Sequence, residues 1–338
     1  MPRTRLGGIK VFENRAFLSW SGGRPEALGQ LCAHMAADRH NMGLLTHLAG
    51  VGSGESITAA CALRAECFAG YPRREAGGCG DSWKILDGIC RISIYPHDRR
   101  TGIAAVLIRV LHENGTRAHA VCSSPSAVTV VIPSADFRVT MERLFEFFEF
   151  PSYASFPEWH TVYREQEIEL QTVRCSYHEQ VIHIYDFSRR TDLDLWNLVL
   201  PAASLPGLAD VLFEMDGSRL KVPFLLFNPF QEKDELSFAF SAEIADRREV
   251  ERILRRNLPE ADVFLHGPMT LFFLHGPHFG DRYGIANALV SALQRAGIRI
   301  IALSCTVASI SFAVESDDQD GIIEALKPSF QTPGGMNG

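Results

Sequence analysis

One stretch of the sequence occurs twice, and this internal repeat constrains the fold more than any short motif does. Residues 101–148 read TGIAAVLIRVLHENGTRAHAVCSSPSAVTVVIPSADFRVTMERLFEFF, and residues 283–330 repeat the same pattern without a gap. The shared positions begin with Gly102 and Gly284, and they end with Phe148 and Phe330. Because the spacing stays constant throughout, we expect both copies to fold in the same way.

The second copy shows which elements the repeat contains. After Gly284, apolar residues recur with the spacing of one helix face, and Gly297 ends this predicted helix. The run around Phe312 alternates with a period of two, as a half-buried strand does. Asp318 is a candidate N-cap for a second helix. With an apolar strand at 270–274 in front, the order is strand, helix, strand, strand, helix.

Weaker versions of this order fill the rest of the chain. We predict an α+β fold of four ferredoxin-like βαββαβ modules in tandem, arranged as two pseudo-repeated halves. The predicted modules are residues 1–83 (a degenerate copy), 84–157, 158–267 and 268–333. Two helices cover one face of such a sheet, and its edge strands expose unpaired hydrogen-bonding groups. We therefore expect modules to pair within the chain and between chains, as in a homodimer.

Three local expectations concern segments outside the repeat. Residues 8–20 are predicted to form a strand, a turn and a second strand. Residues 158–175 are predicted to be a strand-rich entry into the third module. Asp192 and Asp194 are expected in a polar, solvated loop before Trp196, although a carboxylate pair could also act in acid–base chemistry.

Charge and composition limit the partners. The chain has 338 residues, an apolar content of 46% and a net charge of −7, so it can bury a core but lacks the basic character of a nucleic-acid or membrane-surface protein. The eight cysteines show no C-x-x-C spacing and are interpreted as reduced thiols. The N-terminus lacks the apolar region of a signal peptide, and no run reaches eighteen apolar residues. We expect a cytoplasmic protein that contacts neither nucleic acid nor membrane.

The repeated unit resembles the ACT domain, a small regulatory module best known from aspartate kinase. The matching signature is G-[IV]-A-x-x-L-x-x-x-L-x-x-x-G, followed by an apolar strand, a serine-rich turn and I-S-x-x-V. Here it stands as Gly284-Ile285-Ala286, Leu289, Leu293 and Gly297, then Ser304-Cys305-Thr306, then Ile310-Ser311 and Val314. The agreement extends over about fifty residues in each copy and is fainter elsewhere.

The resemblance implies where a ligand would bind. ACT modules hold amino-acid effectors at the loop before the first helix, where paired modules meet. The physical chemistry agrees, because a helix N-terminus offers unpaired N–H groups to a carboxylate, a nearby Asp can meet an amino group, and a glycine permits close approach. The candidate ligand-binding residues are Asp98, Thr101, Gly102, Ile103, Asp281, Tyr283, Gly284 and Ile285. An ordinary capped helix start is the alternative for any single module.

The repeat also departs from the effector-binding pattern of the kinase family. Modules of that kind often carry Asn two residues after the second glycine and Asp two further on. This chain has Arg117 and His119 in one copy, and Arg299 and Ile301 in the other. The Glu typical after the serine-rich turn is Val307. Either the effector differs, or these modules serve only for pairing.

The sequence offers no recognisable catalytic, metal or cofactor motif. The glycine-rich stretch 50–54 lacks the third glycine of a dinucleotide loop and the Gly-Lys pair of a Walker loop, so it is interpreted as a hairpin loop. His275 and His278 flank a Gly-Pro turn and are expected to be exposed loop histidines. The opening Lys-[Phe/Tyr]-Gly-Gly motif of aspartate kinase has no counterpart, and too little chain precedes the repeats for a kinase domain.

These observations predict that the protein is not an enzyme. The favoured function is a non-catalytic regulatory protein that binds a small amino acid or related metabolite at module interfaces, without a cofactor or metal. The alternative is an interaction module that mediates oligomerisation or binds a protein partner without a small ligand. A third possibility is an enzyme with an unrecognised site.

Overall fold

Four long antiparallel strands run through the molecule and connect its parts. They are β2 (Gly8–Gly22), β5 (Lys84–Tyr95), β10 (Asp186–Pro201) and β13 (Asp262–His275). In this computed structural model, residues 3–24, 26–51, 54–61, 83–95, 100–170, 181–229, 234–276, 282–306 and 309–331 are described. β2 pairs with β5 and β10 pairs with β13 along most of their lengths, and each pair has a register shift near its middle.

The two copies of the sequence repeat fold with the same order of elements. In the first copy, β5 is followed by α2 (Thr101–Glu113), β6 (Ala120–Ser123), β7 (Val128–Pro133), α3 (Phe137–Phe147) and β8 (Phe148–Glu149). In the second copy, β13 is followed by α7 (Ile285–Arg295), β14 (Ala302–Cys305), β15 (Ser309–Glu315), α8 (Gln319–Leu326) and β16 (Phe330–Gln331). The constant spacing seen in the sequence is therefore matched by equivalent elements.

The other two predicted modules contain related elements. The first has β1 (Thr4–Arg5), α1 (Ala27–Ala37), β3 (Met42–Val51) and β4 (Gly54–Cys61) in addition to β2. The third has α4 (Phe156–Leu170), β9 (Ile182–His183), α5 (Leu205–Gly217), β11 (Leu225–Pro229), β12 (Glu235–Glu243) and α6 (Arg247–Asn257) in addition to β10. We refer to the four predicted ranges as the first to fourth segments.

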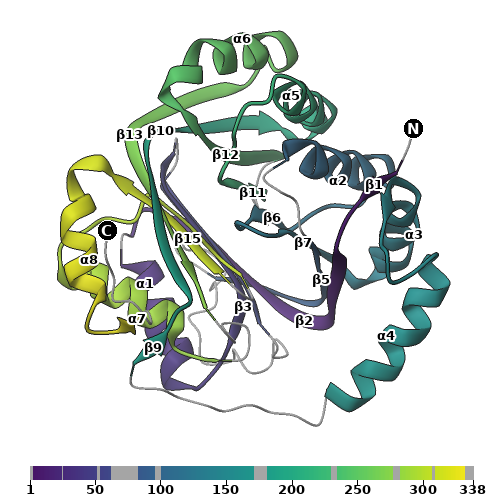
Figure 1. The fold of residues 1–338 in the computed structure, drawn as a ribbon, viewed down its shortest axis with the longest axis horizontal. Coiled ribbons are helices and arrows are strands. Elements are labelled where there is room, and N and C mark those ends of the chain that lie inside the picture. Colours follow the sequence, from purple (N-terminus) through teal and green to yellow (C-terminus); the bar gives the residue numbers. More distant parts are fainter. Residues whose placement is uncertain are drawn as a thin grey trace, which may run out of the picture.

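Most of the described strands join into one large antiparallel sheet that closes on itself, while β1 with β8 and β9 with β16 form two short parallel pairs. Within the described residues the order around the ring is β10-β12-β11-β6-β7-β5-β2-β4-β3-β14-β15-β13, and β13 returns to β10. β6 pairs with β11, which joins the second segment to the third, and β3 pairs with β14, which joins the first to the fourth. The fold is thus a mixed arrangement of helices and a large antiparallel sheet (Figure 1).

Helices cover the outside of this sheet in two groups. α2, α3, α5 and α6 lie over the second and third segments, and α1, α7 and α8 lie over the first and fourth, on the other side of the molecule (Figure 1). Each group has its own apolar core between helices and sheet. A third core, which includes Phe17, Phe224 and Phe273, contains strand residues from all four segments. Removing these apolar surfaces from water is the main stabilising contribution.

The two local predictions for residues 8–20 and 158–175 are wrong. Residues 8–22 form one strand rather than two, because the register shift between Phe12 and Arg15 absorbs the irregularity without a turn. The predicted strand-rich entry at 158–175 is instead occupied up to Leu170 by α4. Its aromatic residues Phe156, Trp159 and Tyr163 have helical spacing, and the first two contact Phe137 of α3.

Asp194 does not lie in a solvated loop. It belongs to β10, its side chain is fully buried, and both of its carboxylate oxygens accept hydrogen bonds from Arg247 at 2.7 and 2.8 Å. Its neighbours Leu193 and Leu195 point into the inner core. The alternation of this run is therefore that of a strand, and Asp194 anchors the start of α6.

Candidate functional site

The second and third segments meet where α2 packs against α5. The start of α2 contacts the second half of α5, because the Thr101 hydroxyl donates a hydrogen bond of 2.8 Å to the carbonyl oxygen of Leu212. Arg100 pairs with Asp216 at 3.4 Å beside this contact. A Cβ added to Gly102 would lie 2.7 Å from the Asp216 carboxylate, so the absence of a side chain permits this approach. This end of the junction is filled by protein side chains.

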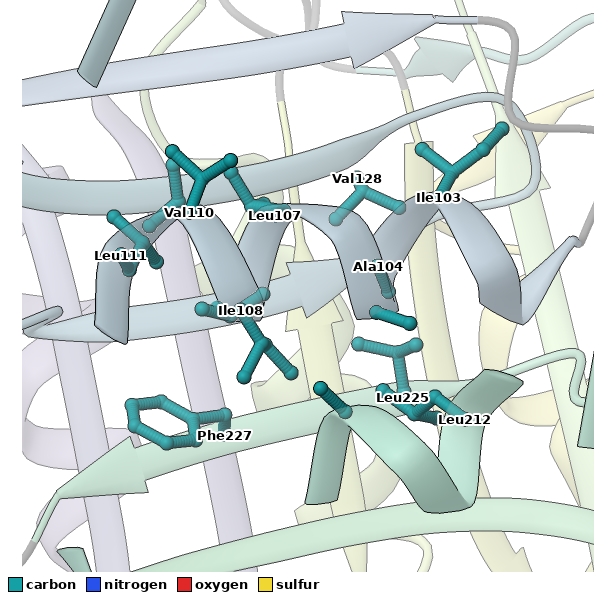
Figure 2. Close-up of a cluster of buried hydrophobic side chains, with 14 of the residues drawn as sticks. Ile103, Ala104, Leu107, Ile108, Val110, Leu111, Val128, Leu212, Leu225 and Phe227 are labelled. Carbon is teal, nitrogen blue, oxygen red and sulfur yellow. The ribbon is translucent and has the colours of Figure 1, made fainter. Parts of the chain in front are cut away.

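The other end of the same junction is hollow. A small, partly open cleft lies where the start of α5 meets the end of α2. Its lining residues are Ile108, Leu111, Thr116, Arg117, Ala118, Val121, Ala202, Leu205, Phe227, Glu235 and Leu236. Figure 2 shows Ile108 of α2 directed toward Phe227 of β11, with Leu111 beside it. The walls are thus mostly apolar and come from two segments.

A few polar groups stand out against these apolar walls. Thr116 is 5% exposed, and its hydroxyl has no hydrogen-bond partner among the described residues. A buried hydroxyl without a partner is unfavourable, so a local rearrangement that let a ligand atom bond to it would be stabilising. Arg117 and Glu235 add one positive and one negative side chain to the lining. Apolar walls with a few placed polar groups are typical of small-molecule sites.

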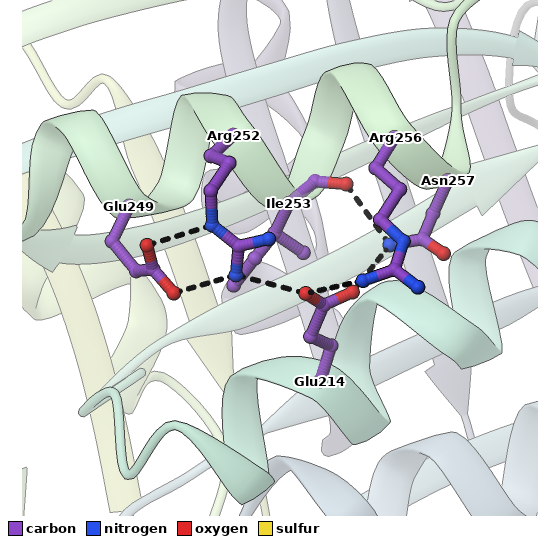
Figure 3. A network of polar contacts seen from close by, with 6 residues as sticks. All are labelled: Glu214, Glu249, Arg252, Ile253, Arg256 and Asn257. Atoms are coloured by element: carbon purple, nitrogen blue, oxygen red, sulfur yellow. Dashed lines mark hydrogen bonds and ion pairs between the residues drawn. The ribbon is translucent and has the colours of Figure 1, made fainter.

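A polar network holds α5 against α6 and so fixes the third-segment side of the cleft. Glu214 of α5 accepts hydrogen bonds from Asn257 at 2.8 Å and from Arg252 at 2.9 Å, and Arg252 also donates to Glu249 (Figure 3). The hydrogen bond from Asn257, followed by that from Arg252, lowers the pKa of Glu214 below its usual value. Glu214 therefore keeps its charge, and its contacts, to lower pH than an isolated carboxyl.

The residues predicted to bind a ligand lie at two separate junctions. Thr101, Gly102 and Ile103 begin α2 and pack at its junction with α5. Tyr283, Gly284 and Ile285 stand at the start of α7, which packs against α1 at the junction of the first and fourth segments. Asp98 and Asp281 lie outside the described residues. Whether any of these residues contacts a ligand stays a prediction.

Gly284 has a clear structural role at its junction. It precedes α7 with φ of 85°, a left-handed conformation that favours glycine. A Cβ placed there would lie 3.9 Å from the Cβ of Ala36 at the end of α1. The glycine is therefore needed for the backbone turn into α7 rather than for lack of space.

Most of the cleft residues were not predicted from the sequence. The predicted ligand contacts lie in the loops that begin the first helices of the second and fourth segments, whereas the cleft lies between the end of α2 and the start of α5. Arg117 was noted as a departure from the effector-binding pattern, and its position was the available signal. Leu205, Phe227 and Leu236 carry no such signal, because apolar residues at these positions are indistinguishable from ordinary core residues.

The junction of the first and fourth segments contains buried titratable groups. His47 of β3 is 3% exposed, and its Nε2 donates to the carbonyl oxygen of Ile300 at 3.2 Å. Burial lowers the pKa of His47 to about 4. Glu55 pairs with Arg299 at 3.6 Å, and burial raises the pKa of Glu55 despite this partner. Within the described ranges, no three His, Cys, Asp or Glu side chains gather to form a metal site.

Comparison with known proteins identifies the fold. The sequence matches no family model and no curated protein. The structure is similar to that of aspartate kinase from Synechocystis, with a TM-score of 0.70 and 16% identity over 96% of this chain. The match covers 55% of that protein, so the chain spans about half of its length. Regulatory subunits of aspartate kinase from Thermus thermophilus and Thermus flavus match over 42% of this chain, with TM-scores of 0.37 and 0.39 and identities of 13% and 14%.

The similarity to aspartate kinase bears on two predictions, that the chain is not an enzyme and that it resembles the regulatory region of aspartate kinase. The prediction that the chain is not an enzyme is contradicted, because the fold of 96% of this chain matches that of a kinase. The lack of a recognised local motif, on which this prediction relied, does not exclude catalysis. The likeness to aspartate kinase is confirmed at the level of the fold.

None of the helices in the described part of the chain has the length and apolar character needed to cross a bilayer.

Proposed function

We propose that this chain is the amino-acid-responsive region of an enzyme of the aspartate kinase type, and that four ACT-like modules form it. The cleft between α2 and α5 is the ligand site. The observation that supports this proposal best is an apolar cleft at a segment junction whose lining includes Thr116, a residue whose buried hydroxyl has no partner among the described residues. The similarity to aspartate kinase over nearly the whole chain supports the kind of enzyme.

The chemistry of the cleft favours an amino acid with an apolar side chain. Arg117 offers a guanidinium for the ligand carboxylate, and Glu235 offers a carboxylate for its ammonium group. Apolar residues such as Leu111, Phe227 and Leu236 would surround the side chain. The start of α5 adds the positive end of its dipole to the attraction for a carboxylate.

The regulatory effect follows from where the ligand binds. The cleft walls come from both α2 and α5, so a bound ligand stabilises the pairing of the second and third segments. A ligand shifts such an equilibrium by its differential affinity for the paired and altered arrangements. We expect a homodimer in the cytoplasm to be the responding species.

A thermal-shift screen with the twenty amino acids tests this proposal. A ligand at about one hundred times its Kd raises the free energy of unfolding by roughly 2.7 kcal/mol. We expect an apolar amino acid to give a shift that Arg117→Gln reduces. Arg138→Gln is the matched control, since Arg138 is an exposed arginine of α3 that pairs with Glu142 away from the cleft. No shift with any amino acid, or an equal shift in both variants, would contradict the proposal.

The filled end of the junction favours a second role for that region. The Thr101 hydroxyl is already bonded to Leu212, and Asp216 occupies the space beside Gly102. This end fits a structural role in which segments pair without a small molecule. Substituting Thr101 by Val should then lower the free energy of unfolding without changing the affinity for any ligand found in the screen.

A further inference from the structure

The first part of β13 carries an unusual cluster of exposed apolar side chains. Val263, Phe264 and Leu265 are 43%, 37% and 41% exposed, although they are consecutive residues of one strand. Consecutive side chains of a strand point to opposite faces, so both faces of β13 are exposed here. Surface patches of this kind are characteristic of interaction sites.

The outer edge of this part of β13 has no neighbouring strand within the described ranges. Residues 262–266 pair with β10 on one side, whereas β15 pairs with β13 only from Met269 onward. Among the described residues, no strand pairs with the other edge over 262–266. Figure 1 shows β13 beside β10, on the side of the molecule away from α4. An edge of this kind has free backbone groups that can bind another strand.

The equivalent strand in the other half is protected by charge. β5 and β13 can be aligned at their register shifts, where Ile89 pairs with Arg15 and Met269 pairs with Leu193. Five residues before these positions, β5 has Lys84 and β13 has Phe264. Lysine is a residue that proteins place on edge strands to prevent association. The same position in β13 is apolar, so the sequence opposes association at one edge and not at the other.

We propose that β13 residues 262–266 pair with the same residues of a second copy of this chain, antiparallel about a two-fold axis at Phe264. In this register Phe264 faces its own counterpart, and Val263 faces Leu265 of the other copy. Asp262 then faces His266, so an acidic side chain meets an imidazole rather than another acid. A two-fold axis at Val263 or Leu265 would pair fewer of these five residues with residues of the same segment in the other copy. The register about Phe264 is therefore self-complementary in shape and charge.

The length of the paired segment is limited at one end. Pro268 follows His266 after one residue and has no backbone N–H to donate to a partner strand. The interface is thus a short strand pair with apolar side chains on both faces. It joins the sheets of two molecules edge to edge and leaves the cleft between α2 and α5 untouched, since none of its residues lines that cleft.

Sedimentation velocity of the full chain over a range of micromolar concentrations tests the pairing. We expect a dimer for the parent protein, and at least a tenfold weaker dimer for Phe264→Lys, which copies the residue at the equivalent position of β5. Val139→Lys is the control, because Val139 is similarly exposed at 42% but lies on α3. A monomeric parent protein, or equal dimers in all three proteins, would overturn the proposal.

A crosslinking experiment covers the case in which Phe264→Lys fails to fold. Directly opposed residues in antiparallel strands have Cα atoms about 4.5–5.5 Å apart, which suits a disulfide bond. Oxidised Phe264→Cys should therefore form a covalent dimer in excess of the parent protein, whereas Val139→Cys should not. The described cysteines Cys32, Cys90, Cys122 and Cys305 are buried and add little background. Absence of the excess dimer, or an equal yield from Val139→Cys, would show that another surface, or a different protein partner, covers this edge.

Discussion

The two helix pairs that join the segments use different side chains for the same geometric task. α2 and α5 are linked by polar contacts, among them Arg109–Asp210 at 2.8 Å and Thr101–Leu212 at 2.8 Å. Both pairs contain a close approach at a glycine, since a Cβ on Gly102 would lie 2.7 Å from Asp216 and a Cβ on Gly29 would lie 2.6 Å from the Gln294 side chain. α2 and α5 contact each other more extensively than α1 and α7 do, and the cleft lies at one end of that contact.

The repeat allows the two junctions to be compared position by position. Arg109 of α2 reaches across to α5, but α7 has Ser291 at the equivalent position, and this hydroxyl donates to Asn287 of its own helix at 3.2 Å. On the sheet side, β15 has the fully buried Phe312 where β7 has Val130. The same scaffold thus combines a large core residue with a less extensive helix contact in one half, and a smaller residue with a more extensive helix contact and an ion pair in the other.

The largest expected effect comes from shortening these two core residues. Phe312 is fully buried and stacks on Phe272 with ring centroids 5.2 Å apart. Phe312→Ala should lower the free energy of unfolding by about 3–5 kcal/mol, because it leaves a large cavity. Val130→Ala removes two methyl groups and should cost roughly 2 kcal/mol. Urea unfolding of both variants measures the difference.

This comparison would fail if Val130→Ala cost as much as Phe312→Ala. Such a result would mean that the core beneath α2 and α5 cannot adjust to a smaller residue, and that the core beneath α1 and α7 can. Val139→Ala, at an exposed position on α3, is a suitable control and should change the stability by less than about 0.5 kcal/mol.

The order of elements in the two repeated segments could be predicted because it depends on local patterns. The helical spacing around Leu107 and Leu289, and the alternation around Val130 and Phe312, indicate the same elements that the structure contains. The closure of the sheet could not be predicted, because the pairing of β6 with β11 joins residues more than one hundred positions apart. No periodicity in a single segment encodes such a partner.

A junction between segments could be predicted from the sequence as the place to look for a ligand, whereas the position of the cleft could not. The glycines and threonine at the helix starts pointed to a junction between segments, and the cleft does lie at a junction. Its position at α5 depends on how Asp216 fills one end, while the Thr116 hydroxyl at the other end has no partner in the part of the chain that the structure describes. These differences arise from side chains of both segments together, and a single sequence does not show which side chains meet.

The second prediction concerns the pH dependence of the junction between the first and fourth segments. The pKa of buried His47 is about 4, well below the usual value of 6.5. The unfolded state therefore binds more protons between these values, so the stability is complete above about pH 6.5 and falls as the pH drops toward 4. From pH 7 to pH 5, His47 should lower the free energy of unfolding by roughly 2 kcal/mol. Urea unfolding at both values measures this loss.

His47→Gln separates this effect from other titrating groups, including His119, whose pKa is also lowered by burial to about 4. The variant should lose less stability than the parent protein on acidification, by the amount assigned to His47. Equal losses in both proteins would mean that His47 does not remain neutral at this junction.

A smaller effect is expected from the hydrogen bond at the filled end of the α2–α5 junction. Thr101→Val keeps the shape but removes the donor to the Leu212 carbonyl, and it should cost about 1 kcal/mol. Thr140→Val is the matched control, because Thr140 is fully buried in α3 and its hydroxyl has no partner among the described residues. We expect that control to be neutral or stabilising in thermal unfolding. A larger loss for Thr140→Val than for Thr101→Val would contradict the assigned bond.

The smallest expected effect is that of the exposed pair Arg109–Asp210, and it tests whether polar contacts or packing join α2 to α5. The two side chains are 40% and 55% exposed, so a double-mutant cycle should give a coupling of about 0.2–1 kcal/mol. The Arg109 guanidinium also lies 4.6 Å from the Phe213 ring centre, so Arg109→Ala should cost more than Asp210→Ala. High salt should remove most of the coupling but leave the contact with Phe213. If salt instead abolished the whole effect of Arg109→Ala, the guanidinium would contribute charge alone, and charge would distinguish this position from Ser291 at the α1–α7 junction.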